Sequence, residues 1–105
     1  MPNSELVVSD TSPLLNLALI SRLDLLKSQF SGITIPSQVW EELADGEEGL
    51  DALRELREIG FLTVVEVERS DLFTEIFHEL DLGETAAICY AIEQDADLIL
   101  LDERD

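Results

Sequence analysis

The chain has 105 residues, which is the length of one domain. Hydrophobic residues make up 46% of it and charged residues 29%, a composition that is typical of globular domains and excludes a disordered chain. Because no run of about 18 apolar residues occurs, we expect no membrane-spanning helix. The formal net charge is −18, the reverse of the basic surface that nucleic-acid-binding proteins usually carry.

The acidic excess leaves three interpretations open. A surface adapted to high salt would have this charge, and salt would screen its repulsion of phosphate. Alternatively, a second chain supplies the basic contacts, or the charges only keep the protein soluble. The single cysteine, Cys89, cannot form an internal disulfide, and the N-terminus lacks the basic flank of a signal peptide. A cytoplasmic location is therefore expected.

The predicted elements alternate between short apolar strands and helices. Residues 6–8 form the first strand, which ends at Asp10, and Ser12 and Pro13 suit the cap and the first position of the next helix. Ser21 begins a capping box for the second helix. The elements from there on are a helix over residues 21–29, a strand over 33–35, a helix over 36–43, a helix over 50–59, a strand over 62–67, a helix over 71–80, a helix over 84–94 and a strand over 98–101.

Strands that are apolar throughout and separated by helices indicate a parallel sheet covered on both faces. The sequence therefore predicts an α/β fold, a three-layer α/β/α sandwich. No linker or repeat divides the chain, so we expect a single domain over residues 1–105.

Four acidic residues stand where a strand end or a helix face points a carboxylate inward. Asp10 follows the first strand and Asp102 the last, and ligands bind at the carboxyl ends of the strands in such sheets. Glu42 continues the apolar face of its helix, unlike Glu41, and Glu84 heads an apolar stripe. Each also has a structural interpretation: Asp10 as a helix cap, Asp102 as a turn residue, Glu84 as a charge favoured at a helix N-terminus, and Glu42 as a solvated side chain.

A cluster of carboxylates requires protons or a cation. Two carboxylates about 4 Å apart repel each other by roughly 4 kcal/mol at an effective dielectric constant near 20. Oxygen ligands suit Mg²⁺ or Mn²⁺, whereas zinc would require His or Cys, of which the chain has only His78 and Cys89. Because there is neither a glycine-rich phosphate loop nor a Ser/His pair, kinase-like and serine-hydrolase chemistry are excluded.

Four segments in order along the chain carry a family resemblance. They are V-V-S-D-T-S at residues 7–12, I-P followed by V-W-E-E-L within residues 35–43, L-G-E-T-A at residues 82–86 and L-L-D-E-R-D at residues 100–105. Together they resemble the PIN-domain family, which includes the toxin ribonucleases of toxin–antitoxin pairs. The resemblance implies a parallel sheet of strand order 3-2-1-4 and cleavage of single-stranded RNA with Mg²⁺ or Mn²⁺. It also implies that the catalytic residues and metal ligands are Asp10, Glu42, Glu84 and Asp102.

The resemblance places further groups beside the metal and marks two departures from the family pattern. It implies accessory roles for Ser12, Asn16 and Asp105. Leu100 stands where such proteins usually carry Thr or Ser, and the chain stops where family members continue with another strand and helix. We therefore expect a C-terminally truncated domain whose last strand lies at the sheet edge, where it pairs with a second copy or a partner.

Two functions stay open from the sequence. The first is a metal-dependent ribonuclease that acts on single-stranded RNA and is the toxin partner of a small antitoxin protein. The second is a catalytically weak or inactive PIN-like module that binds protein or nucleic acid. A homodimer is expected in either case. A receiver-like phosphotransfer domain is disfavoured, because no aspartate follows the third strand.

Overall fold

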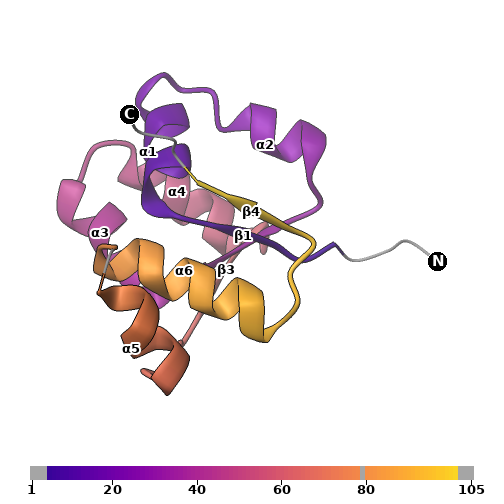
Figure 1. The fold of residues 1–105 in the computed structure, drawn as a ribbon. Coiled ribbons are helices and arrows are strands. Elements are labelled where there is room, and N and C mark those ends of the chain that lie inside the picture. The colour runs from indigo at the N-terminus through magenta and orange to yellow at the C-terminus, as the bar shows by residue number, and fades with distance from the viewer. Residues whose placement is uncertain (1–4, 79, 102–105) are drawn as a thin grey trace.

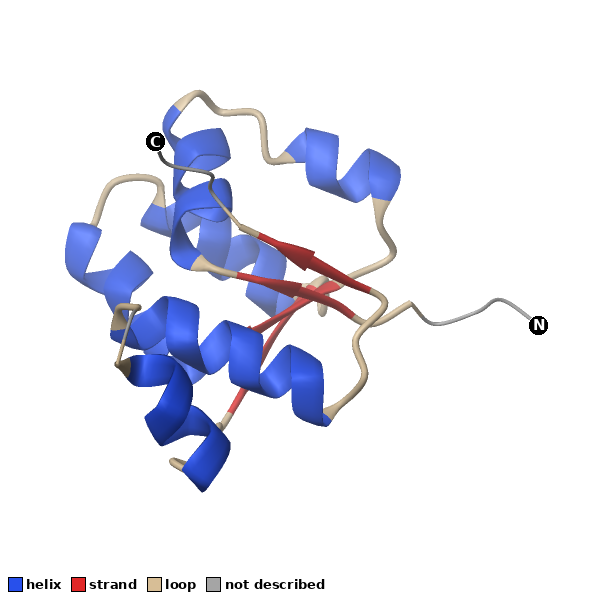
Figure 2. Ribbon diagram, in the orientation of Figure 1, coloured by secondary structure: helices blue, strands red, loops and turns tan. Residues whose placement is uncertain are grey.

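Four short strands form one parallel sheet, with helices on both faces (Figures 1 and 2). The computed structural model describes residues 5–78 and 80–101. Along the chain the elements are β1 (Val7–Ser9), α1 (Thr11–Leu19), α2 (Asp24–Gln29), β2 (Ile33–Pro36), α3 (Ser37–Gly46), α4 (Leu50–Glu58), β3 (Leu62–Val65), α5 (Asp71–Phe77), α6 (Leu82–Glu93) and β4 (Leu98–Leu100). The sheet order is β3-β2-β1-β4 and every pair is parallel, so the predicted fold class and strand order are confirmed.

Two apolar cores lie on the two faces of the sheet. The larger one packs residues of α1, α2, α3 and α4 against β1, β2 and β3, with Leu14, Leu43 and Leu53 fully buried at its centre. The smaller one lies under α5 and α6, around Phe73 and Cys89. Figure 1 shows α5 and α6 together on one side of β1 and β4, opposite α1 and α2. The buried location of Cys89 agrees with a packing role for its thiol.

The first helix begins earlier than predicted. It starts at Thr11, and Asp10, rather than Ser12, occupies the cap position with an extended backbone. Pro13 then lies in the first turn, where its missing N–H leaves no intrahelical bond unmade. The strand end and the helix start are therefore separated by Asp10 alone.

The predicted capping box at Ser21 is wrong, because this residue ends α1 instead of starting α2. Ser21 has a left-handed backbone, with φ of +58°. Its amide donates to the carbonyl of Ala18 (3.1 Å), and the amide of Arg22 donates to the carbonyl of Leu17 (2.8 Å). These two bonds are the Schellman arrangement that terminates a helix. The second helix begins at Asp24 without a side-chain cap.

The remaining boundaries differ by a few residues from the prediction. Gly60 has φ of +84°, as the predicted left-handed position after α4 requires. Helix α6 begins at Leu82, two residues before the predicted start at Glu84. Asp81 therefore stands directly before the helix, at its N-cap. Within the described ranges, no helix is both long and apolar enough to cross a bilayer.

Replacing Leu53 with alanine should destabilise the protein strongly. The Leu53 side chain is fully buried in the larger core, so its truncation removes apolar contacts and leaves a cavity. We expect the free energy of unfolding in urea to fall by about 2–5 kcal/mol. Ile59→Ala is the control, because Ile59 is 59% exposed and its truncation should change stability little. Equal losses in the two variants would contradict this assignment of the core.

Candidate metal centre

Asp10 directly follows β1, at the carboxyl end of the sheet, toward which the strand arrows point in Figure 2. Its backbone amide donates to the carbonyl of Leu100 (3.0 Å), which holds Asp10 beside the end of β4. The residue is only 7% exposed and makes no side-chain capping bond. Its Oδ1 is buried and has no hydrogen-bond partner within the described part of the chain. Because an unpartnered buried carboxylate oxygen is costly, this atom requires a proton or a cation.

Glu42 reaches the same place from α3. On that helix Val39 and Leu43 are fully buried and anchor one face in the larger core. The Glu42 side chain extends from the rim of this face, and its Oε1 accepts a hydrogen bond from the Thr11 hydroxyl. Its position is consistent with the apolar-face argument made from the sequence. The side chain is exposed, as the alternative of a solvated glutamate requires, but it is also held by this hydrogen bond.

Asp81, which the sequence analysis did not select, is the third member of the cluster. It caps α6: its Oδ1 accepts from the amide of Glu84 (2.8 Å), and its carbonyl accepts from the Thr85 hydroxyl (2.6 Å). One carboxylate oxygen from each of Asp10, Glu42 and Asp81 lies within 4.8 Å of the other two. The end of β1, the middle of α3 and the start of α6 therefore bring three carboxylates together.

A local signal for Asp81 was present in the sequence. Asp81 and Glu84 have the spacing of a capping box, in which an acceptor precedes the helix and a glutamate stands three residues later. Interpreting residues 81–83 as a turn placed the helix start at Glu84. In the structure the helix begins at Leu82, so Asp81 is its N-cap. The Asp81 carboxylate lies beside that of Asp10.

The other predicted site residues occupy different places. Glu84 is half-buried in the first turn of α6, close enough for its charge to act on Asp10, but it does not belong to the group of three. Ser12 is half-buried in the first turn of α1, and Asn16 is exposed further along that helix. Asp102 and Asp105 lie outside the described residues. The roles assigned to these five residues stay predictions.

The pKa of the Asp10 carboxyl is raised from its ordinary value of 3.8 to about 6, and burial is the largest cause. The negative charges of Asp81, Glu84 and Glu42 contribute to this rise, whereas the backbone amide of Thr11 lowers the pKa. Three acidic neighbours on a desolvated carboxylate make the charged form costly without a counterion. The electrostatics of the site therefore favour a bound cation at neutral pH.

The residues present fit a hard divalent cation. Every donor in the group is a carboxylate oxygen, which is the ligand that Mg²⁺ and Mn²⁺ prefer. The Oδ1 of Asp10 accepts no hydrogen bond from the described residues, so its lone pairs are available to a cation. His78 is exposed at the C-cap of α5 and Cys89 is buried in the smaller core, and neither belongs to this group.

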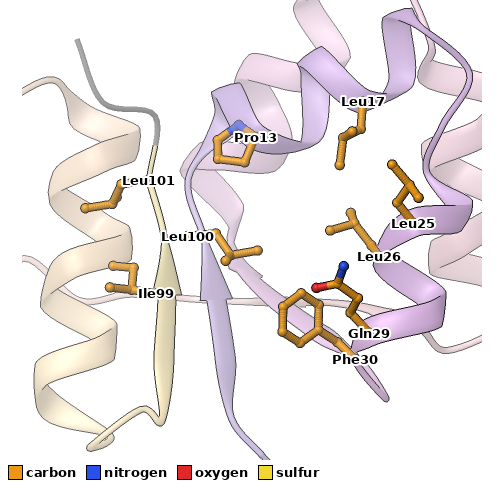
Figure 3. A pocket seen from close by; sticks show the side chains of 9 residues that line it. All are labelled: Pro13, Leu17, Leu25, Leu26, Gln29, Phe30, Ile99, Leu100 and Leu101. Carbon is orange, nitrogen blue, oxygen red and sulfur yellow. The ribbon is translucent and has the colours of Figure 1, made fainter. Parts of the chain in front are cut away.

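An apolar cavity elsewhere in the fold carries no comparable chemistry. It is a cavity of about 430 Å³ between α1, α2 and β4 (Figure 3). In Figure 3, Leu100 points from β4 toward Leu26 and Phe30, while Ile99 and Leu101 point to the other side of the strand. None of its lining residues is titratable. The candidate for a chemical function is therefore the acidic cluster.

Asp10 should make the stability of the metal-free protein depend on pH. Since folding raises its pKa, the folded state binds its proton more tightly than the unfolded state does. This contribution is present below about pH 4 and is lost as the pH rises through about 6. The rise in the pKa of Asp10 from 3.8 to about 6 corresponds to a change of roughly 3 kcal/mol in the free energy of unfolding. Between about pH 3 and pH 7, Asp10→Asn should therefore gain up to that amount over the native protein in urea unfolding with EDTA. A constant difference would contradict the burial of this charge.

Two substitutions should separate the capping role of Asp81 from its role as a ligand. Asn is as good a helix cap as Asp, whereas Ala loses the bond to the Glu84 amide. We therefore expect Asp81→Ala to be about 1 kcal/mol less stable than Asp81→Asn in metal-free urea unfolding. Both variants lose the negative charge, so both should bind Mn²⁺ more weakly in calorimetric titration. Native Mn²⁺ affinity in Asp81→Asn would remove Asp81 from the metal centre.

One comparison with known proteins identifies the family. A family model described as a PIN domain (DUF3368) matches residues 6–105. No curated protein and no solved structure matches the chain. Since the matched region covers nearly the whole sequence, the chain belongs to the PIN-domain family, as the four sequence segments indicated.

Proposed function

We propose that this PIN-domain protein is a ribonuclease that cleaves single-stranded RNA with the help of Mg²⁺ or Mn²⁺. The PIN domain is a nuclease fold, and the acidic cluster provides a place for a divalent cation. The observation that carries the proposal is the buried carboxylate of Asp10, whose Oδ1 has no hydrogen-bond partner in the described chain and one of whose oxygens lies within 4.8 Å of carboxylate oxygens of Glu42 and Asp81. The choice of RNA and of these two metals rests on the resemblance of the four segments to toxin ribonucleases.

Each residue of the cluster has a defined part in this proposal. Asp10, Glu42 and Asp81 would hold the cation, with Glu84 adding negative charge at the N-terminus of α6. When bound, a divalent cation supplies an activated water and neutralises charge on the phosphate. The bond from Thr11 to Glu42 and the cap made by Asp81 keep two of the three carboxylates in place. Asp102 is proposed as a fourth ligand on sequence grounds alone.

The excess of 24 acidic over 6 basic residues gives the cation a second role in this proposal. Arg22 lies 3.4 Å from a carboxylate oxygen of Asp24, Arg57 stacks on Trp40 at 4.9 Å and Arg69 stacks on Phe73 at 5.5 Å. With a net charge of −18, the surface repels a phosphate backbone. A bound metal would add positive charge at the site, and RNA binding should be weaker without it.

We extend the proposal to the biological setting. The resemblance to toxin ribonucleases favours a cytoplasmic toxin that a small antitoxin protein holds inactive. The acidic surface suits a partner of positive charge, because complementary potentials steer association and exclude wrong partners. This part of the proposal rests on the sequence segments and on the net charge.

The exposed edge strand favours a second function, that of an interaction module. Among the described residues β4 lies at the edge of the sheet, and Leu98 and Leu101 are 44% and 41% exposed. Parallel strands are normally buried on both faces, and an open edge is a template for pairing with another chain. In this alternative, homodimerisation or partner binding is the function and the acidic cluster serves no catalysis.

A cleavage assay on single-stranded RNA decides between the two functions. We expect cleavage with Mg²⁺ or Mn²⁺ and none with EDTA. Asp10→Asn keeps the shape of the side chain but weakens metal binding, so its activity should fall by at least about 100-fold. Glu41→Gln, which removes an exposed charge from the adjacent helix position, should retain activity within about twofold.

The two proposed functions predict different results in these experiments. Cleavage that survives EDTA, or an Asp10→Asn variant as active as Glu41→Gln, would refute the metal-centre mechanism. A folded native protein that binds no Mn²⁺ and cleaves no RNA would favour the interaction module instead.

A further inference from the structure

We propose that Gly83 and Thr11 are positioning residues for the Glu42 carboxylate. The missing side chain of Gly83 leaves the space in which this carboxylate lies, and the Thr11 hydroxyl fixes one of its oxygens. We call this arrangement the Glu42 seat. The inference rests on the proposed function in one respect, namely that Glu42 is a metal ligand.

The evidence for Gly83 is steric. Gly83 is buried in the first turn of α6. A methyl group built on its Cα would lie 2.9 Å from Cδ and 3.0 Å from Oε2 of Glu42, and still closer to Oε1. Carbon atoms in contact lie about 3.5–4.0 Å apart, so the carboxylate and a methyl group cannot occupy these positions together. The three atoms nearest to that methyl group all belong to the Glu42 carboxylate, so this carboxylate occupies the space next to Gly83.

The backbone of Gly83 gives no competing reason for glycine. The glycines with a positive φ are Gly49 and Gly60, and Gly83 is not one of them. An alanine can adopt the helical conformation of α6 and is more favourable there than glycine. The absent side chain is therefore explained by the neighbouring carboxylate and not by the local fold.

The evidence for Thr11 is its hydrogen bond. Thr11 is the first residue of α1, directly after Asp10, and its hydroxyl donates to Oε1 of Glu42. A side chain of α3 is thus held between the starts of α1 and α6. Glu42 is exposed and has a long, flexible side chain, so holding it in advance reduces the entropy lost when it binds a cation.

Gly83→Ala should displace the carboxylate without unfolding the protein. The atoms that the methyl group meets belong to the flexible end of Glu42, which can swing away, and not to the backbone. The melting temperature of the metal-free protein should therefore stay level or rise by a few degrees. Mn²⁺ affinity should fall about 10- to 100-fold, which is the usual effect of removing a group that orients a ligand. Gly46→Ala is the matched control, because Gly46 ends α3 and a methyl group there meets nothing within 4 Å.

Thr11 gives a second, independent variant. Thr11→Val removes the hydroxyl and keeps the shape, and it should also weaken Mn²⁺ binding at least tenfold. Thr11→Ser keeps the hydroxyl and should restore affinity to within about twofold of the native protein. In a Glu42→Gln background, Gly83→Ala should cause no more than a twofold further loss, because both changes act through the same carboxylate. Additive losses would overturn the proposal.

A measurement without metal keeps the seat separate from the proposed function. In metal-free protein, the carboxyl carbon resonance of Glu42 should shift in Gly83→Ala and Thr11→Val but not in Gly46→Ala. An unchanged resonance in the first two variants would overturn the seat whether or not metal binds. If the native protein bound no Mn²⁺ while the resonance still shifted, the proposed function would fail and the positioning of Glu42 would stand.

Discussion

Asp10 keeps a carboxylate buried at the end of β1, where one oxygen has no partner in the described chain and where Glu42, Asp81 and Glu84 add negative charge. Carboxylates at such separations repel each other by roughly 3–4 kcal/mol per pair at an effective dielectric constant near 20. The folded, metal-free protein therefore carries an electrostatic cost that a cation would remove. The raised pKa of Asp10, the all-oxygen donor set and the need for fixed carboxylates all follow from this cost.

The parallel sheet is what makes the convergence possible. Because β1 and β4 are adjacent and parallel, the main chain of Asp10 is bonded to the end of β4, and the starts of α1 and α6 lie at the same edge. Asp81 then has two tasks, since one of its oxygens caps α6 while its carboxylate belongs to the acidic group. Glycine at position 83 is less favourable in a helix than alanine would be, but it leaves room for the Glu42 carboxylate. At both positions, local helix chemistry and the geometry of the site are coupled.

The overall charge has a consequence for how a nuclease of this composition would act. Nucleic-acid-binding proteins usually gain affinity from many lysine and arginine contacts, which salt weakens. Here three of the arginines that the structure describes, at positions 22, 57 and 69, are engaged with Asp24 or with aromatic rings. A bound cation would add attraction for phosphate at the acidic cluster, and salt would screen repulsion by the rest of the surface.

The sequence by itself determined the fold class and the part of the site that rests on local periodicity. Continuous apolar strands between helices predicted the parallel sandwich, and the helical repeat separated Glu42 from Glu41, because both signals depend only on neighbours within a few residues. The resemblance of four segments supplied the strand order and the family, which the fold and the family match confirm. Boundaries were less certain, as at Ser21, where the same residue type suits the start of one helix and the end of another.

Only the tertiary structure decided which carboxylate joins Asp10 and Glu42. Whether Asp81 or Glu84 meets them depends on where α6 begins and how it packs against α3, and that packing joins residues about forty positions apart. The packing of α6 against α3 also explains the glycine at position 83, because the Glu42 side chain lies where a Cβ of residue 83 would be. The local sequence around Gly83 does not predict this contact. Contacts of this range follow from the burial of whole elements, and no local pattern of residues encodes them.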